Sequence, residues 1–336
     1  MSNKIRIPAE WEEHRAIWTC WPSDKELWLE DIEPARAEIA AMIKALITPH
    51  NGKFDKVKLL VSGEEAFSSA RAALPEAVEI FEIPFGDIWL RDTGPIFAKD
   101  GDNNIALCFG FNGWGGKYVL DYDDEVNGKL ANAALVQSEN IEMVLEGGSI
   151  DGNGQGVFLT TTQCLLNKNR NPQLSKADIE TLFVENLGMT QMIWLGDGLL
   201  NDHTDGHIDN IARFVGERTI ICQAPVDNDP NQEVLDKIYN DLCAARDEFG
   251  NGFEVIRAPS PGKVTDEDGK IIPASHMNFI IGNGSVVMPH YGTPSADAAL
   301  KVLAECFPNH KIIGIKAEAV LTGGGSFHCI TQQEPL

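Results

Sequence analysis

Five copies of one sequence pattern constrain the fold of this chain more than any other feature. Each copy is a polar or glycine-rich turn followed by a run rich in β-branched and aromatic residues, which favour strands. The copies begin about 50 to 70 residues apart, a spacing typical of arrays and propellers. In the fourth copy, Asn283 and Gly284 separate two such runs and predict a two-residue hairpin. The copies cover residues 87–111, 146–166, 203–225, 275–292 and 323–333.

Helical patterns separate these copies, because apolar side chains recur three and four residues apart. One of these patterns opens on a capping-box-like pair, Ser175 and Asp178, and stops at Gly188. The unit of strands plus one helix predicts an α/β fold in which about five units surround a centre, with the polar turns facing inward. The helical patterns cover residues 34–47, 175–188, 231–250 and 295–308.

A doubly wound parallel sheet is the alternative α/β architecture. The chain has no Rossmann GxGxxG after a first strand and no GxxxxGK[ST] loop, which are the phosphate-binding signatures of such sheets. The length of 336 residues fits one large domain or two ordinary ones. Because no low-complexity linker divides the chain, we expect a single catalytic domain over residues 1–336.

Composition narrows the partners and the compartment. The formal net charge of −23 disfavours nucleic acid or an anionic membrane and would concentrate a cationic small molecule, although solubility alone explains it equally well. No run approaches membrane-spanning length, and the first residues lack the apolar core of a signal peptide. The seven cysteines are scattered without a CxxC pair, which favours reduced thiols. These features predict a soluble, cytoplasmic protein, with the choice between monomer and homo-oligomer left open.

Each copy places unusual polar residues at the mouth of an expected strand. Ionisable groups that converge from separate strand ends predict a site better than any one of them does. A cysteine combined with histidine and carboxylates elsewhere in the chain is a candidate nucleophile set. The residues concerned are Arg91 and Asp92, Glu146, His207 and Asp209, His276 and Asn278, and His328 and Cys329.

Cys329 is the candidate nucleophile. It follows three glycines at 323–325, which let the backbone approach a ligand closely and leave a thiol accessible. The alternative is a structural cysteine on a last strand, where Phe327, Cys329 and Thr331 would share a face. The glycine run favours the nucleophile.

The segment around His207 allows two kinds of site. On a strand, His207 and Asp209 would point to the same side, and a histidine beside a carboxylate suits proton transfer near neutral pH. The rival is a divalent metal site made by His203, Asp205, His207 and Asp209, whose imidazole and carboxylate groups are suitable ligands. A plain turn at Asp205 and Gly206 is the structural alternative.

Two further carboxylates carry weak signals. Asp92 follows Arg91, and an Arg–Asp pair is more often a structural salt bridge than part of a site. Glu146 precedes two glycines, so a turn carboxylate in solvent is the simplest interpretation.

Taken together, these motifs resemble the agmatine deiminase family of the guanidino-group-modifying (pentein) superfamily. Their order and spacing are specific, although no single motif is decisive. The resemblance implies a five-bladed α/β propeller around a central active site, in agreement with the five copies above. It covers most of the chain through residues 7–22, 88–97, 111–116, 145–150, 203–210 and 323–335.

The resemblance implies a role for each matching residue. Cys329 matches the family's nucleophile, His207 its general acid/base and Glu146 the carboxylate that partners this histidine. Asp92 and Asp209 match the two carboxylates that grip the guanidinium nitrogens.

Two further residues match the family pattern, and a third departs from it. Trp89 matches an aromatic residue that lines the substrate channel. His328 belongs to the nucleophile motif and should point away from Cys329 if the strand is regular. His203 departs from the pattern, since an acidic residue is expected before residues 204–207, and this puts the far end of the pocket in question.

The resemblance therefore implies a hydrolase that converts agmatine and water to N-carbamoylputrescine and ammonia through a covalent thiouronium on Cys329, in putrescine and polyamine biosynthesis. It implies no metal and no cofactor, and a small cationic guanidino compound as the only partner. The alternatives are a deiminase of arginine, of a terminal peptidyl-arginine or of another guanidino compound. A metal-dependent hydrolase built on residues 203–209 and a guanidino-binding protein without turnover are further alternatives.

Overall fold

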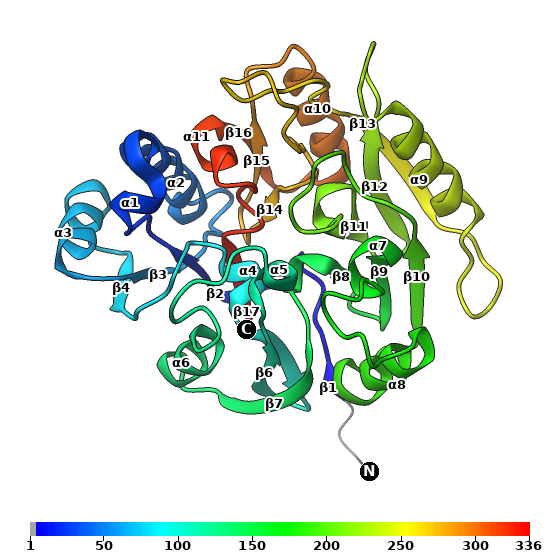
Figure 1. The fold of residues 1–336 in the computed structure, drawn as a ribbon, viewed down its shortest axis with the longest axis horizontal. Coiled ribbons are helices and arrows are strands. Elements are labelled where there is room, and N and C mark those ends of the chain that lie inside the picture. Colours follow the sequence, from blue (N-terminus) through cyan, green and yellow to red (C-terminus); the bar gives the residue numbers. More distant parts are fainter. Residues whose placement is uncertain (1–4) are drawn as a thin grey trace.

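The computed structural model describes residues 5–336, and within this range the strands form five sheets (Figure 1). One of them shows the rule that most of the others follow. Strand β11 (Ala212–Gly216) pairs antiparallel with β12 (Thr219–Ala224) as a hairpin. Helix α9 (Gln232–Ala244) then leads to β13 (Glu254–Pro259), which lies parallel to β12. Each such unit is a hairpin plus one helical crossover, as the sequence pattern predicts.

Three other sheets repeat this order. They are formed by β5 (Ile96–Asp100), β6 (Asn103–Gly110), α6 (Val126–Ala133) and β7 (Gln137–Val144), with β1 (Ile5–Arg6) at the edge beside β5; by β8 (Ile150–Gly152), β9 (Val157–Thr161), α8 (Lys176–Leu187) and β10 (Gln191–Leu195); and by β14 (Ile280–Ile281), β15 (Ser285–His290), α10 (Ala296–Cys306) and β16 (Lys311–Lys316).

The fifth sheet combines segments from the two ends of the described range. Strand β17 (Thr331–Pro335) pairs antiparallel with β2 (His14–Cys20), with Thr331 opposite Thr19. The sheet continues through parallel strands in the order β17-β2-β3-β4. Its remaining elements are α2 (Ile32–Ile47), β3 (Val57–Val61), α3 (Glu64–Ala73) and β4 (Glu79–Glu82).

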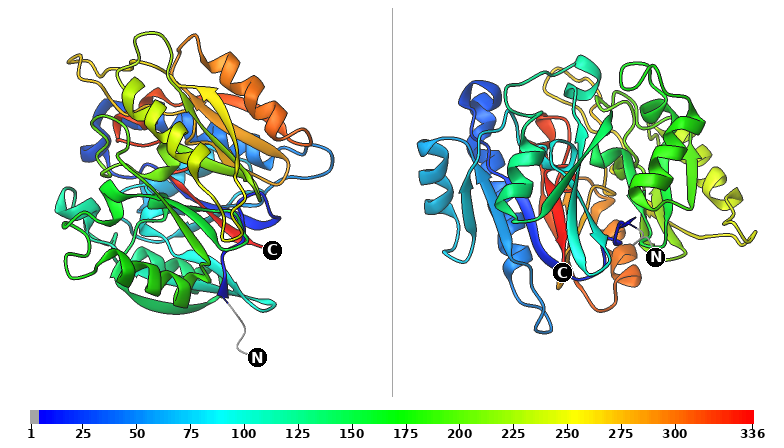
Figure 2. Two further views of the ribbon diagram at one scale, coloured as in Figure 1. Left: turned by 90° about the vertical axis from the view of Figure 1, so that its right-hand side faces the viewer. Right: turned by 90° about the horizontal axis from the view of Figure 1, so that it is seen from below.

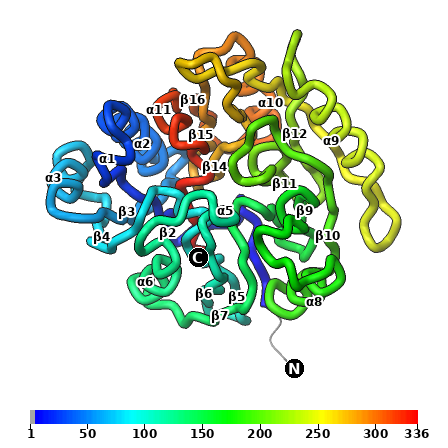
Figure 3. The backbone as a smooth tube through the Cα atoms, in the orientation of Figure 1, coloured from blue at the N-terminus to red at the C-terminus, as the bar shows by residue number. Residues whose placement is uncertain are grey.

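The five sheets surround a centre, and the longer helices lie on the outside (Figure 1). The tube in Figure 3 passes from sheet to sheet in sequence order around this ring. Seen from below in Figure 2, the red C-terminal strand lies beside the blue N-terminal one, in agreement with the β17–β2 ladder. The predicted five-bladed α/β propeller is confirmed, and the doubly wound sheet is not formed by residues 5–336.

Local sequence signals explain several boundaries. In α8, the Ser175 side chain accepts a hydrogen bond from the Asp178 backbone and the Asp178 side chain accepts one from the Ser175 backbone, so the capping box is confirmed. Gly188 ends this helix with φ 64°, a left-handed conformation that glycine adopts at low cost. The hairpin between β14 and β15 turns at Asn283 and Gly284, as predicted. A Cβ at Gly284 would lie 2.3 Å from the Lys53 carbonyl oxygen, so only glycine fits there.

Short helical turns join the longer elements, and several of them carry the polar residues singled out above. They are α1 (Lys25–Trp28), η1 (Leu29–Asp31), α4 (Leu90–Thr93), α5 (Gly113–Gly116), η2 (Gly147–Ser149), α7 (Thr162–Leu165), η3 (Ile208–Asn210) and α11 (Glu318–Thr322).

Buried apolar side chains fill the space between each sheet and its neighbours. Cys108 and Cys222 belong to this interior and behave as small apolar residues, as expected. Among residues 5–336, no helix is both long enough and apolar enough to cross a bilayer. The first four residues of the predicted domain lie outside the described range.

The pairing of β17 with β2 is predicted to depend on Glu334. Its fully buried carboxylate accepts hydrogen bonds from the Trp18 indole and the Lys58 ammonium, both at 2.9 Å. Glu334→Ala leaves both donors unpaired and should lower the free energy of unfolding by about 3 kcal/mol. Urea unfolding followed by circular dichroism measures this change. The exposed Glu267→Ala serves as the control, and an equal stability of the two variants would contradict the prediction.

Candidate active site

The polar residues of the five sequence copies occupy equivalent positions in the fold. In each unit they lie on the turn just before the first strand of the sheet, where the chain reaches the centre of the ring. The strand expected over residues 207–209 was wrong, because Asp209 lies in η3. Asp92 lies in α4, and Cys329 lies in a turn before β17. The side chains nevertheless converge, because a tight turn aims successive polar groups into one space.

Gly148 marks the point where three of these side chains meet. A Cβ at this residue would lie 2.6 Å from Nδ1 of His207, 2.9 Å from Oδ1 of Asp92 and 3.1 Å from Oδ2 of Asp209. Glycine is therefore required here, because any side chain would displace the histidine or a carboxylate. The predicted group of two aspartates and a histidine is thus formed by the structure.

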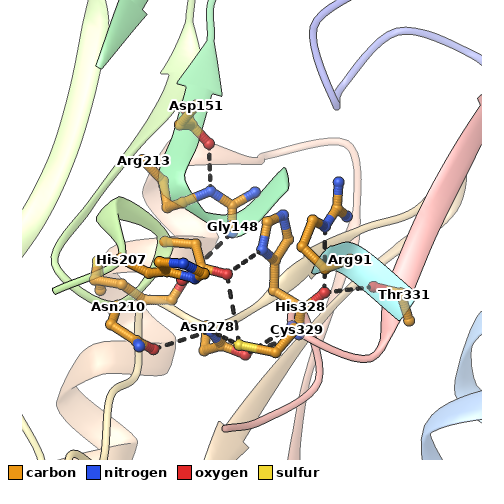
Figure 4. A network of polar contacts seen from close by, with 12 residues as sticks. Arg91, Gly148, Asp151, His207, Asn210, Arg213, Asn278, His328, Cys329 and Thr331 are labelled. Atoms are coloured by element: carbon orange, nitrogen blue, oxygen red, sulfur yellow. Dashed lines mark hydrogen bonds and ion pairs between the residues drawn. The ribbon is translucent and has the colours of Figure 1, made fainter. Parts of the chain in front are cut away.

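Cys329 lies against this group and is held by Asn278 (Figure 4). The Asn278 amide nitrogen donates a hydrogen bond to Sγ at 3.0 Å, and its Oδ1 accepts from the backbone N–H groups of His328 and Cys329. Sγ also lies 3.5 Å from Oδ2 of Asp209. Asn278 was noted in the sequence without a role, since contact with a residue 51 positions away leaves no local signal.

The electrostatics favour the protonated form of Cys329. Burial raises the pKa of the Cys329 thiol well above its ordinary value, and the negative charges of Asp209 and Asp92 raise it further. The charge in the site is instead placed on the histidine. Burial alone would lower the pKa of His207, but Asp92, Cys164 and Glu146 outweigh burial and raise it well above the usual range.

The two aspartates differ in their surroundings. Asp92 accepts hydrogen bonds from the Gly148 backbone at 2.9 Å and the Trp114 indole at 2.8 Å, and burial raises its pKa. Asp209 is equally buried, yet a 2.8 Å hydrogen bond from His328 and nearby positive charges lower its pKa. Within residues 5–336, Oδ1 of Asp209 has no hydrogen-bond partner, so it is free to accept one from a ligand.

His328 points away from the cavity but still serves the site. Its Nδ1 contacts Asp209, and its Nε2 contacts Oε2 of Glu10 at 3.0 Å. Glu10 in turn pairs with Arg213. Arg213 also pairs with Asp151 (Figure 4). Asp209 is thus held by a chain of buried groups behind it.

Glu146 is fully buried, so the interpretation as a solvent-exposed turn carboxylate was wrong. Its Oε2 lies 4.0 Å from Nε2 of His207, and its Oε1 accepts a 2.6 Å hydrogen bond from Nε of Arg170. Arg170 also contacts the Asp205 carboxylate and the Thr204 carbonyl. The sequence analysis missed Arg170, which holds Glu146 and the turn before His207 in one arrangement.

The alternative metal site at residues 203–209 is not formed. The Asp205 carboxylate forms two ion pairs, one with the Lys117 ammonium and one with the Arg170 guanidinium, each with a nitrogen–oxygen distance of 2.6 Å. His203 turns toward Tyr118, with 3.1 Å between its Nδ1 and the phenol oxygen. Two cations on one carboxylate, together with diverging side chains, leave these four residues unsuited to share an ion.

A cavity of about 350 Å³ opens onto Cys329 and Asp92. Trp89 lines it as predicted, and its indole donates a 2.6 Å hydrogen bond to Asp87, which also accepts one from Trp28. A Cβ at Gly325 would lie 2.6 Å from the Trp89 ring and 3.2 Å from Sγ of Cys329, which explains a glycine of the run before Cys329.

The walls of the cavity are aromatic, apolar and acidic. Of the residues that the structure describes, neither lysine nor arginine lines it. The acidic lining residues are Glu30, Asp31, Asp87 and Asp92. Such walls fit a cation with an apolar chain and offer neither a lysine nor an arginine to pair with a carboxylate.

Two of the noted residues lie elsewhere. His276 is buried against Tyr291, its Nδ1 contacts the Pro259 carbonyl at 2.9 Å, and burial lowers its pKa to about 4. Arg91 extends toward Gln332, at 2.6 Å, on the far side of His328. Both side chains are therefore bound to structural groups and not to the group around Cys329.

Comparison with known proteins places these residues in context. Residues 6–335 match the family model of the Porphyromonas-type peptidyl-arginine deiminases. An agmatine deiminase of Stutzerimonas stutzeri is 37% identical, covering 98% of this chain and 95% of that protein. A solved agmatine deiminase of Enterococcus faecalis superposes with a TM-score of 0.91 at 33% identity, covering 99% of this chain and 96% of the other. An agmatine deiminase of C. jejuni with substrate bound gives 0.88 at 33% identity, covering 98% and 96%.

The raised pKa of Cys329 predicts how the free protein reacts with a neutral alkylating agent. Only the thiolate reacts, so iodoacetamide should modify Cys329 slowly at pH 7, with a rate that rises about tenfold per pH unit through about pH 9. Mass spectrometry of the peptide that contains Cys329 measures this rate, with the exposed Cys243 in the same digest as the reference. A rate that levels off below pH 8 would contradict the prediction.

The Asn278 contact predicts a second effect on the same thiol. Asn278→Asp keeps the acceptor for the two backbone N–H groups but replaces the donor to Sγ by an oxygen. Loss of one hydrogen-bond donor to an anion lowers kcat about 100-fold, so we expect a loss of this size in Asn278→Asp. Alkylation of Cys329 should slow as well, because the thiolate loses the same donor. Asn240→Asp on the exposed surface of α9 is the matched control. An unchanged alkylation rate in Asn278→Asp would show that the amide does not stabilise the thiolate.

Proposed function

This chain belongs to the family of Porphyromonas-type peptidyl-arginine deiminases, and we propose that it is an agmatine deiminase, which converts agmatine and water to N-carbamoylputrescine and ammonia. One observation carries the proposal. A buried cysteine, a histidine and two aspartates lie together, and the cysteine and one aspartate line a cavity whose described walls hold four carboxylates and neither lysine nor arginine. A guanidinium on an apolar chain is the ligand that these groups complement.

Asp92 and Asp209 bind the guanidinium. Each carboxylate accepts charge-assisted N–H bonds, which are short and directional for a planar cation. The unpartnered Oδ1 of Asp209 is one such acceptor. Because Sγ of Cys329 lies beside Asp209, binding holds the central carbon of the guanidinium near the sulfur, in the orientation that attack requires.

The first half of the reaction forms a thiouronium. The positive charge of the substrate offsets the aspartates that keep Cys329 protonated, so the thiol releases its proton to solvent as the substrate binds, and the thiolate then attacks the central carbon. A carbon–sulfur bond forms and gives a tetrahedral adduct. His207, protonated at rest, gives its proton to the departing nitrogen, the carbon–nitrogen bond breaks, and ammonia leaves.

The second half hydrolyses this intermediate. His207 is now neutral, and Glu146 faces its Nε2. The imidazole accepts a proton from water as the water oxygen attacks the same carbon. The carbon–sulfur bond breaks, the proton of the added hydroxyl passes to the Cys329 sulfur, and the urea product is released, while His207 is left protonated as at rest. The aspartates bind the cation of the substrate, so this scheme uses no metal and no cofactor.

The cavity walls favour agmatine over arginine. The two molecules share the guanidinium and the alkyl chain, but arginine adds an α-carboxylate. Burying that carboxylate beside Glu30, Asp31 and Asp87, without a cation in the described lining, costs binding energy that agmatine does not lose. Terminal peptidyl-arginine would meet the same acidic walls.

The wider setting follows from this activity. N-carbamoylputrescine is a precursor of putrescine, so we place the reaction in polyamine biosynthesis in the cytoplasm. The net charge of −23 supports a small cationic substrate and disfavours nucleic acid or an anionic membrane as a partner.

Ammonia release from purified protein tests the proposal. Agmatine should be turned over with a kcat/KM at least about 100-fold above that of arginine, since an unpaired buried group costs that much discrimination. Activity should survive EDTA, and Cys329→Ser should lose at least about 10⁴-fold in kcat with an unchanged circular dichroism spectrum.

Cys222→Ser, which alters a buried thiol far from the site, should stay active. Turnover by Cys329→Ser, or loss of activity in EDTA, would refute the thiol mechanism. A preference for arginine would change the assigned substrate, but it would not contradict the thiol mechanism.

A further inference from the structure

Cys164 is a buried thiol beside the catalytic histidine that the proposed reaction does not use. It lies in α7, directly after β9. Its Sγ, an oxygen of Glu146 and a ring nitrogen of His207 all lie within 4.8 Å of one another. All three side chains are fully buried. A thiol and a carboxylate from one unit of the fold thus converge with an imidazole from the next unit.

Two members of this cluster carry unpartnered polar atoms. Oε2 of Glu146 and both ring nitrogens of His207 are buried without a hydrogen-bond partner within residues 5–336. Such atoms lower the stability of a folded protein unless a ligand or a water molecule forms a hydrogen bond or a coordination bond with them. Two of them, one from each residue, lie beside the thiol and indicate a place where a ligand would be stabilised.

The donor set selects the chemical class of that ligand. Cysteine sulfur, histidine nitrogen and carboxylate oxygen are the ligands of zinc, and sites with three protein ligands keep a fourth position open. Two ligand atoms of a tetrahedral zinc lie about 3.3 Å apart, given bonds of about 2.0 Å. Nε2 of His207 and Oε2 of Glu146 are 4.0 Å apart, so this pair needs to approach by less than about 1 Å.

The groups around the cluster already form the second layer that metal sites need. Nε of Arg170 holds Oε1 of Glu146 at 2.6 Å and leaves Oε2 free. Nδ1 of His207 faces Oδ1 of Asp92 at 3.8 Å, so a ligand on Nε2 would find the opposite N–H directed at a carboxylate. Carboxylate–histidine–zinc arrangements of this kind are the rule in zinc proteins.

The turn that carries Cys164 is also tied to the histidine. The backbone N–H of Cys164 donates to Oγ1 of Thr161, and that hydroxyl donates to the carbonyl of Gly206 at 2.7 Å. Gly206 precedes His207 in the chain. The thiol and the imidazole therefore keep a fixed relative position.

From this geometry we infer that Cys164, Glu146 and His207 form an inhibitory site for zinc or a similar thiophilic divalent cation. A metal bound there takes the lone pair with which His207 accepts protons, so deimination stops while the fold is kept. Zinc binding itself does not depend on the proposed function; only the inhibition rests on it. The site is separate from Cys329, which supplies none of the three ligands.

The binding test uses the Cys329→Ser protein, so that the nucleophile cannot supply a ligand. Zinc is titrated in competition with a chromophoric chelator, first for Cys329→Ser and then for the same protein with Cys164→Ala or Cys222→Ala added. We expect one zinc per chain in the first and third proteins, and an affinity at least about 10-fold lower with Cys164→Ala. Cobalt should give a thiolate charge-transfer absorption that is lost with Cys164→Ala alone.

Equal zinc affinity with and without Cys164, or no binding to any of these proteins, would overturn the inference. The latter would mean that the three groups are completed by water or by the thiol proton. These results do not depend on turnover, so they are distinct from a failure of the proposed function.

Inhibition is measured on proteins that retain Cys329. Zinc should inhibit ammonia release from agmatine by the unmodified protein and by Cys222→Ala, and EDTA should restore it. The zinc concentration for half inhibition should rise at least about 10-fold in Cys164→Ala. Equal inhibition of all three proteins would place the inhibitory zinc on another group, such as Cys329, and would refute the assignment.

Discussion

The ladder between β17 and β2 is the interaction on which the active site depends. It joins residues more than three hundred positions apart, and it fixes the turn that carries Cys329 against the first long strand. The Thr19 hydroxyl donates to the Ile330 carbonyl, and the backbone N–H of Arg91 donates to the Cys329 carbonyl. Through these bonds one ladder sets the position of the nucleophile relative to α4, and therefore relative to Asp92.

Charge is the second organising constraint, because several carboxylates are buried around one point. They are arranged so that neighbouring acids differ in pKa: burial raises the pKa of Asp92, while His328 and nearby cations lower that of Asp209. The excess of negative charge favours a protonated His207 and a neutral Cys329. A cationic substrate therefore completes the electrostatics of the site as well as filling it, and this explains how a buried thiol becomes a nucleophile only when it is needed.

The sequence predicted the repeating unit, the helix boundaries at Ser175 and Gly188 and the residues that converge, because turn chemistry and apolar periodicity are local signals. It failed where neighbours in space are distant in the chain. Arg170, which holds Glu146, and Asn278, which holds Cys329, could not be given roles, since nothing near them in the sequence reports their partners. The strand assignment for His207 and Asp209 failed for another reason: polar residues two positions apart are typical of a strand, but here a short helical turn carries Asp209. The roles of the individual site residues stay predictions until they are tested.

The position of Cys329 in the sequence also orders events during synthesis. The two aspartates at 92 and 209, the histidine and its glutamate all precede the nucleophile by more than a hundred residues. A ribosome-bound chain that has emerged as far as β13 can therefore present the carboxylates of the site, but it has neither the sulfur nor the strand that anchors it. Nascent protein cannot modify guanidino compounds until the final sheet closes, so chemical competence coincides with the completion of the tertiary fold rather than preceding it.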